Sequence, residues 1–96
     1  MNRTEHILCC LAEEAAEVGH RVSKALRFGL SEIQEGQALT NAQRITQELN
    51  DLLAIVELLE EVDVLDRSTD IHAIDRKKNK VLAHMAYAER CGTLTP

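Results

Sequence analysis

Four acidic residues form two pairs, and the members of each pair lie three residues apart. The first pair is Glu14 and Glu17, and the second is Glu48 and Asp51. Residues three apart share one face of a helix, so each pair presents two carboxylates in the same direction. Four carboxylates that face one another inside a helical bundle repel unless a cation lies between them. Because carboxylate oxygens are hard ligands, this pattern favours Mg²⁺, with Mn²⁺ as the next choice.

Helical projection places both pairs next to apolar residues. In the segment 3–28, apolar side chains recur at steps of three and four, and the first acidic pair lies at the edge of that stripe. In the segment 40–62, the second pair opens a face that becomes apolar one turn later, at Ile55, Leu58 and Val62. We expect such faces to point at another helix and not at water.

Three long helices are expected to position these acids. The only proline is the last residue, glycines are few, and Leu, Ala and Glu are abundant, which is typical of an all-α chain. The expected helices run from about Arg3 to Phe28, from Thr40 to about Val62, and from about Asp70 to Arg90. Their boundary signals are Asn2 and Gly29 for the first, a Thr40–Gln43 capping box for the second, and Asp70 and Gly92 for the third. We therefore predict a single domain over residues 1–96, a bundle of three long helices with room for a short one.

Composition limits the classes of partner. The formal net charge of −5 and the pI near 5.3 disfavour binding to DNA or RNA. No apolar run approaches the roughly 18 residues that span a bilayer. The cysteines Cys9, Cys10 and Cys91 fit reduced thiols better than a disulfide framework, so a cytoplasmic location is expected. Because the second helix is apolar on two sides, we expect one of its neighbours to be another subunit.

The third helix places Lys78 within its apolar stripe, between Ile74 and Val81. A lysine that faces a core needs an anionic partner. One interpretation is a side chain whose amine reaches water at the bundle edge. The other is a cation aimed at the substrate of the metal site, and metals together with a lysine suit a phosphate chain.

The acidic pairs resemble a known signature. The runs E-E-A-A-E at residues 13–17 and E-L-N-D at residues 48–51 are similar to the E-E-x-x-E and E-x-x-D motifs of the MazG-like all-α nucleoside triphosphate pyrophosphohydrolase superfamily. The resemblance extends to residues 23–29, Asn41 and residues 78–81, and covers most of the chain. It implies Mg²⁺-dependent hydrolysis of (d)NTPs to (d)NMP and pyrophosphate, with nucleotide-pool house-cleaning as the expected role.

The resemblance also implies roles for individual residues. The metal ligands would be Glu14, Glu17, Glu48 and Asp51; the catalytic acids that orient or deprotonate water would be Glu13 and Glu14; the substrate-binding residues would be Lys78, Lys24, Lys80 and Phe28. Members of this superfamily are usually homodimers or homotetramers with active sites built within the oligomer. Because Phe28 is the one aromatic residue on the acidic face, we expect a neighbouring subunit to complete the base pocket.

Three alternatives remain open. Glu17 and His20 form an E-x-x-H, as a di-iron carboxylate bundle requires, but the second acidic pair contains no histidine. A zinc site could begin with His6, Cys9 and Cys10, and would need a further ligand such as Cys91 or a residue of another chain. The alternative of a different class is a non-enzymatic oligomeric helical interaction or regulatory module, in which the acids are only solvated.

Overall fold

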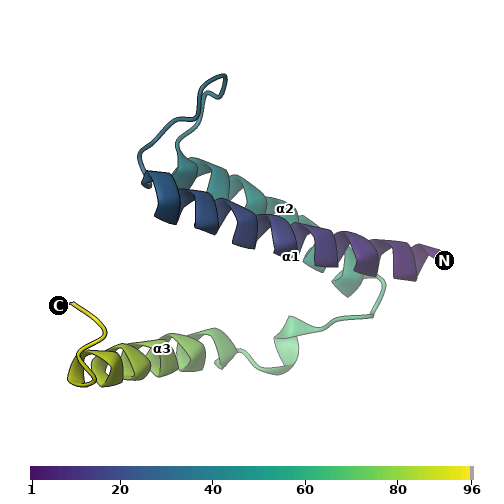
Figure 1. The fold of residues 1–96 in the computed structure, drawn as a ribbon. Helices are drawn as coiled ribbons and strands as arrows, with labels where there is room; N and C mark the ends of the chain where they lie inside the picture. Colours follow the sequence, from purple (N-terminus) through teal and green to yellow (C-terminus); the bar gives the residue numbers. More distant parts are fainter. Residues whose placement is uncertain (96) are drawn as a thin grey trace. The chain divides into compact units, whose positions relative to one another are not determined.

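The computed structural model describes residues 1–95, and within that range it is helical without strands. Its elements are the α-helices α1 (Arg3–Phe28), α2 (Asn41–Glu61) and α3 (Ala73–Arg90), with a short 3-10 helix η1 (Arg67–Thr69). The all-α prediction with three long helices is confirmed (Figure 1). The chain divides into two compact units, residues 1–65 and residues 66 onward, and each is described by itself.

The ends of α1 and the start of α2 follow the sequence signals. The Asn2 side chain accepts a hydrogen bond from the Glu5 backbone N–H at 2.8 Å, and α1 stops at Gly29. Gly29 has φ 102°, a conformation that glycine adopts without the steric cost of a Cβ. Thr40 and the side chain at the third helical position, Gln43, form the predicted capping box. These caps fix where each helix of the first unit begins and ends.

The predicted start of the third helix is wrong by three residues. Asp70 is not its N-cap, because α3 begins at Ala73 after His72. The Asp70 carboxylate instead accepts from the His72 backbone N–H at 3.2 Å and pairs with the Arg76 guanidinium. The side chain of Asp66, which caps η1, accepts from the Ser68 N–H at 2.9 Å. Local side-chain bonds to the backbone therefore shape this segment as a turn before α3 starts.

Helices α1 and α2 pack against each other as an antiparallel hairpin (Figure 1). The face of α1 that is shielded by this packing is Ile7, Leu11, Glu14, Val18, Arg21 and Ala25. The predicted apolar stripe is therefore only partly correct, because Ala15 and Val22 remain exposed. Glu14 and Arg21 take the places in the helix contact that apolar residues were expected to fill.

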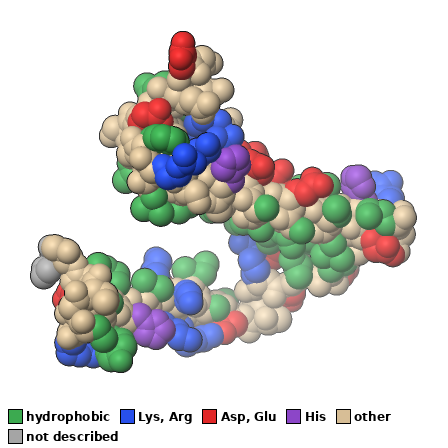
Figure 2. All heavy atoms as spheres, in the orientation of Figure 1, with side chains coloured by type: hydrophobic (Ala, Val, Ile, Leu, Met, Phe, Trp, Pro, Cys, Tyr) green, Lys and Arg blue, Asp and Glu red, His purple; other side chains and the backbone are tan. Residues whose placement is uncertain are grey.

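The apolar core of this hairpin is small. Among the described residues, only Ala25 and Leu59 are buried apolar side chains, at 6% and 0% exposure. Helix α2 contacts α1 with one face, and large apolar residues on either side of that face stay exposed. They are Leu49, Leu53, Leu58 and Val62. Figure 2 shows hydrophobic side chains gathered on the outside of the hairpin. The second helix thus has apolar residues on more than one side, as predicted, and those that do not face α1 are uncovered in the single chain.

In the second unit, α3 exposes its apolar side chains, which are Ile74, Val81, Leu82 and Met85. Lys78 is exposed as well, so the description of Lys78 as facing a core does not hold within this unit. The bundle that was predicted to include all three helices stays a prediction. Within residues 1–95, none of the helices has the length and apolarity that crossing a bilayer requires.

Asn41 fastens the loop between the helices to the hairpin. It is 2% exposed, and its Nδ2 donates hydrogen bonds of 2.8 Å to the Gly29 carbonyl and to Glu32 Oε1. The Asn41 backbone N–H also donates to the Glu32 carbonyl at 3.0 Å. The loop is therefore tied at its start and near its middle to the first turn of α2.

We predict that Asn41→Ala lowers the free energy of unfolding by about 2 kcal/mol, because two side-chain hydrogen bonds of a buried residue that fasten the loop are lost. Urea denaturation followed by circular dichroism measures this change. Asn50→Ala, at an exposed position of the same helix, is the matched control and is expected to change stability little. Equal stability of the two variants would contradict the structural role of Asn41.

Candidate metal centre

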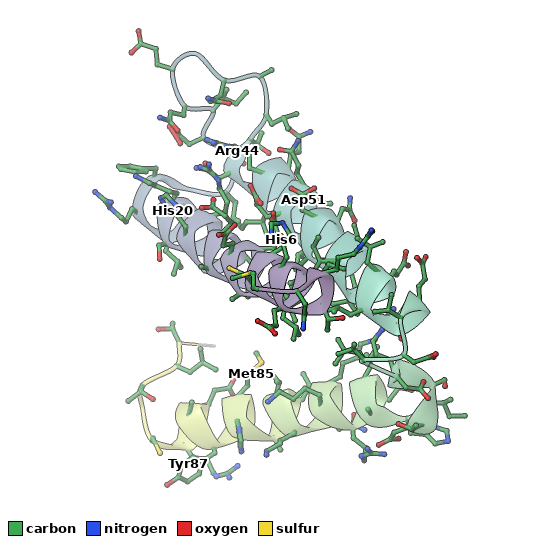
Figure 3. All side chains as sticks on the ribbon, turned by 90° about the vertical axis from the view of Figure 1, so that its right-hand side faces the viewer. His6, His20, Arg44, Asp51, Met85 and Tyr87 are labelled. Atoms are coloured by element: carbon green, nitrogen blue, oxygen red, sulfur yellow. The ribbon has the colours of Figure 1, made fainter. Side chains whose placement is uncertain are left out.

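Three carboxylates from two helices meet in the first unit. Glu14 comes from α1, and Glu48 and Asp51 come from α2. One oxygen of each carboxylate lies within 4.8 Å of an oxygen of the other two. Glu14 and Glu48 are half-buried, while Asp51, which is labelled on α2 in Figure 3, is exposed. The predicted convergence of acids from the two motifs therefore exists for these three residues.

The helix packing explains why these residues meet. Glu14 lies on the α1 face that contacts α2, and Glu48 lies on the α2 face with Ile45 and Leu52. Asp51 follows Glu48 by three residues and so projects to nearly the same side of α2. Because the hairpin is antiparallel, the middle of α1 lies opposite the middle of α2, and the acids come together there.

The crowding of negative charge changes the proton affinity of Glu14. Loss of hydration in the helix contact is the largest cause that raises its pKa above the ordinary 4.5. The carboxylates of Asp51 and Glu48 raise this pKa further, followed by those of Glu17 and Glu13. The ionised form of Glu14 is thus less favoured than that of an isolated glutamate, and a positive charge close to the group would favour it.

Arg21 supplies part of that positive charge, although it is not among the site residues predicted from the sequence. Its Nε lies 4.0 Å from Glu48 Oε1, and both side chains are less than one-fifth exposed. That Nε is buried without a hydrogen-bond partner, so the arrangement is an ion pair without a close hydrogen bond. The spacing could have revealed Arg21, because it lies seven residues after Glu14 and therefore on the same face of α1.

Glu17 and Glu13 lie near this carboxylate group but are not part of it. Both are exposed, and both are close enough to raise the pKa of Glu14. Among residues 1–95, the three-oxygen group includes neither. Glu13 Oε1 instead lies 4.0 Å from the thiol of Cys9. The roles of Glu17 as a ligand and of Glu13 as a catalytic acid stay predictions.

The predicted substrate-binding residues lie in two places. Lys24 and Phe28 line a cavity at the loop end of the hairpin, with the Lys24 Nζ 5.8 Å from the centre of the Phe28 ring. Lys78 and Lys80 lie on α3, in the second unit. There Lys78 contributes with Lys77 and apolar neighbours to a depression on one face of α3. The structure brings the first two residues into one cavity and describes the other two on a separate unit.

The other metal sites considered from the sequence do not form within the described part of the chain. Glu14, Glu48 and Asp51 are the only group of three or more potential ligands at mutual ligand distance among residues 1–95. Neither the His6, Cys9 and Cys10 set nor the Glu17–His20 pair belongs to such a group. The donor set that does form consists of carboxylates alone, which suits Mg²⁺ or Mn²⁺ better than zinc.

Comparison with protein-family models found no matching family, and searches of curated proteins and of solved structures found no match. A functional assignment for this chain therefore rests on its own residues and their arrangement. The resemblance to the MazG-like superfamily stays a hypothesis based on the two acidic motifs.

The raised pKa of Glu14 leads to a prediction about the metal-free protein. Because folding favours protonated Glu14, the contribution of this group to stability is present below pH 4.5 and is lost as pH rises through the folded pKa. We predict that Glu14→Gln raises the Tm in EDTA at neutral pH and flattens the fall of Tm with rising pH. Thermal melting between pH 4 and 8 measures both effects.

Glu57→Gln is the control for this experiment, because Glu57 is an exposed acid of α2 outside the carboxylate group. It removes the same charge and is expected to show the same dependence of Tm on pH as the wild type. If the two variants melt alike at every pH, the repulsion at Glu14 is too small to matter.

Proposed function

We propose that this chain is a Mg²⁺-dependent nucleoside triphosphate pyrophosphohydrolase that converts (d)NTPs to (d)NMP and pyrophosphate. The observation that carries the proposal is the meeting of Glu14, Glu48 and Asp51 within 4.8 Å. These residues come from the two motifs on which the resemblance to MazG-like enzymes rests. Removal of unwanted nucleotides from the pool is the role that this resemblance suggests.

The residues present fit a divalent cation on chemical grounds. All three donors are carboxylate oxygens, the ligand type that Mg²⁺ prefers. The group contains three carboxylates, and Arg21, which pairs with Glu48 at 4.0 Å, supplies a single positive charge. Glu14, Glu48 and Asp51 would hold the cation, with Glu17 the nearest further candidate. When bound, Mg²⁺ supplies charge neutralisation of phosphate oxygens and lowers the pKa of a ligated water.

The reaction transfers the nucleotidyl group to water. The water oxygen forms a bond to the α-phosphorus, and the bond from that phosphorus to the oxygen bridging to the β-phosphorus breaks. Pyrophosphate leaves with the bridging oxygen, and the water proton passes to a carboxylate. Glu14 and the exposed Glu13 beside it on α1 are the acids to which the resemblance gives this step. Glu13 lies outside the three-carboxylate group and would orient or deprotonate the water from there.

Hydrolysis products test the proposal. Anion-exchange chromatography of reactions with NTPs and dNTPs should show monophosphate and pyrophosphate with Mg²⁺ and neither with EDTA. Glu48→Gln should reduce turnover at least about 100-fold, because the change removes a ligand and supporting groups alone are worth 10–100-fold. Glu57→Gln, which carries the same charge change on the same helix, should keep full activity. Diphosphate and phosphate as products, or full activity in Glu48→Gln, would falsify the assignment.

A second candidate function is a non-enzymatic helical module that binds partners through its apolar faces. The exposed apolar residues of α2 and α3 favour this candidate. An interaction module needs no acids inside a helix contact, however, and the half-buried Glu14 and Glu48 are unfavourable there without a cation. A well-folded protein that hydrolyses no nucleotide would favour the module.

Both candidates require a partner, and we infer that it is a second copy of this chain. The first unit buries too little apolar surface for its size, and α3 leaves Leu82 60% exposed and Ile74 69% exposed. Association of copies through these faces would bury apolar surface at about 25 cal/mol per Å². A homodimer or homotetramer is the form in which we expect the active site to be complete.

We predict that light scattering after size exclusion gives the mass of a dimer or tetramer for the wild type. Leu82→Glu should shift the mass towards the 10.7 kDa monomer, because a charge is placed on the apolar face of α3. Ala83→Glu puts the same charge one position on, towards the opposite face, and should keep the wild-type mass. A monomeric wild type at high protein concentration is incompatible with the oligomer.

A further inference from the structure

The loop end of the hairpin contains a cavity, lined mainly by polar residues, that has no part in the proposed bond cleavage. Its volume is about 250 Å³, and it is lined by Lys24, Phe28, Glu32, Gln34 and Asn41. This volume lies below the roughly 300–1,000 Å³ of pockets for drug-sized ligands, so it suits one ring system and not a whole nucleotide. All five residues belong to the first unit, from the end of α1 to the start of α2.

Hydrogen bonds fix the orientation of the polar groups in this cavity. Asn41 Nδ2 holds Glu32 Oε1 at 2.8 Å, which keeps the Glu32 carboxylate at the cavity wall. The guanidinium of Arg44, which is labelled in Figure 3, donates to Gln34 Oε1 at 3.0 Å, so the Gln34 Nε2 is the end of this amide that can donate to another molecule. The cavity therefore presents a carboxylate that only accepts hydrogen bonds and an amide nitrogen that only donates them.

The Phe28 ring and Lys24 form another part of the wall, and Arg27 lies beside the ring outside the cavity lining. The Phe28 side chain is 52% exposed, so its ring is accessible to a bound molecule. Arg27 Cζ and Lys24 Nζ lie 4.8 Å and 5.8 Å from the ring centre. A flat apolar surface beside fixed donors and acceptors is the combination that recognises a nucleobase, by stacking and by hydrogen bonds to its edge.

The cavity lies at a suitable distance from the carboxylate group. Asn41, in the cavity wall, precedes Glu48 of the carboxylate group by seven residues on α2. This spacing corresponds to about 10 Å along the helix. Seven residues are close to two helical turns, so the cavity and the carboxylates lie on the same side of the hairpin. A nucleotide with its phosphates at the carboxylates can reach this cavity with its base.

We propose that this cavity binds the base of the nucleotide and selects bases with an exocyclic amine through Glu32, an inference that rests on the proposed function. A carboxylate accepts hydrogen bonds from the amine of adenine, cytosine or guanine. Guanine offers two adjacent N–H donors and can in addition accept from Gln34. Thymine and uracil present a single N–H between two carbonyls, so a carbonyl oxygen faces the carboxylate and repels it. The expected order places guanine first and thymine and uracil last.

Binding of deoxynucleoside monophosphates tests this inference without requiring turnover. Titrations of the full chain with dGMP, dAMP, dCMP and dTMP in Mg²⁺, followed by NMR chemical shifts, give each Kd. We expect dGMP to bind at least about tenfold more tightly than dTMP, since an unpaired polar group at a buried edge costs at least this factor. In Glu32→Gln, which keeps an acceptor for Asn41, the ratio should fall to about twofold or less.

Glu35→Gln is the matched control, because it removes the same charge from the same exposed loop outside the cavity. It should leave the ratio unchanged. Phe28→Leu should weaken all four ligands to a similar extent, because it removes stacking and not edge recognition. An unchanged ratio in Glu32→Gln, equal binding of dTMP and dGMP by wild type, or no binding of any of the four overturns the inference. Hydrolysis of triphosphates despite such a result would leave the proposed function intact.

Discussion

The unfavourable meeting of carboxylates between α1 and α2 is the constraint on which the rest of this structure depends. Glu14 is half-buried and raised in pKa where two other carboxylates approach it. The ion pair with Arg21 offsets only one of these charges, at 4.0 Å. A small hairpin with Ala25 and Leu59 as its buried apolar side chains has little stability with which to oppose this repulsion. A bound cation would offset this repulsion, and a second copy that covers the exposed apolar faces would add stability.

The loop between the helices sets the register that keeps the acids opposite one another. Gly29 ends α1, Asn41 ties the loop back onto the hairpin, and the Thr40 capping box starts α2. Because Glu48 follows Asn41 by two turns of helix, any shift of this start would move Glu48 along α1. The same bonds shape the wall of the cavity, so the register of the acids and the site proposed for a base depend on one loop.

Much of the fold was predictable from local signals in the sequence. The ends of α1 and the start of α2 are set by caps that each involve residues within four positions, and these predictions are confirmed. Asp70 misled the prediction for α3, because its carboxylate bonds to His72 and Arg76 instead of capping a helix. The spacing of the acids predicted that Glu14, Glu17, Glu48 and Asp51 face one another, and the structure brings three of them together without Glu17.

What depends on packing could not be read from periodicity. The sequence indicates a stripe on α1 but not which part of it faces α2, and the contact proved to include Glu14 and Arg21 in place of Ala15 and Val22. The role of Glu32 in the cavity depends on a hydrogen bond across nine positions, to Asn41, which no helical pattern predicts. The position of Lys78 within an apolar stripe predicted a core-facing cation, whereas the α3 unit leaves it exposed.

Direct titration with Mn²⁺ tests whether Glu14, Glu48 and Asp51 form a cation site. Metal-free protein is added to Mn²⁺, and electron paramagnetic resonance follows the loss of the free-ion signal. We expect the wild type to bind Mn²⁺ saturably and to release it when Mg²⁺ is added. Glu48→Gln should abolish this binding, and Glu57→Gln should preserve it. If the wild type leaves the free-ion signal unchanged, or if Glu48→Gln still binds Mn²⁺, the three carboxylates do not form the proposed cation site.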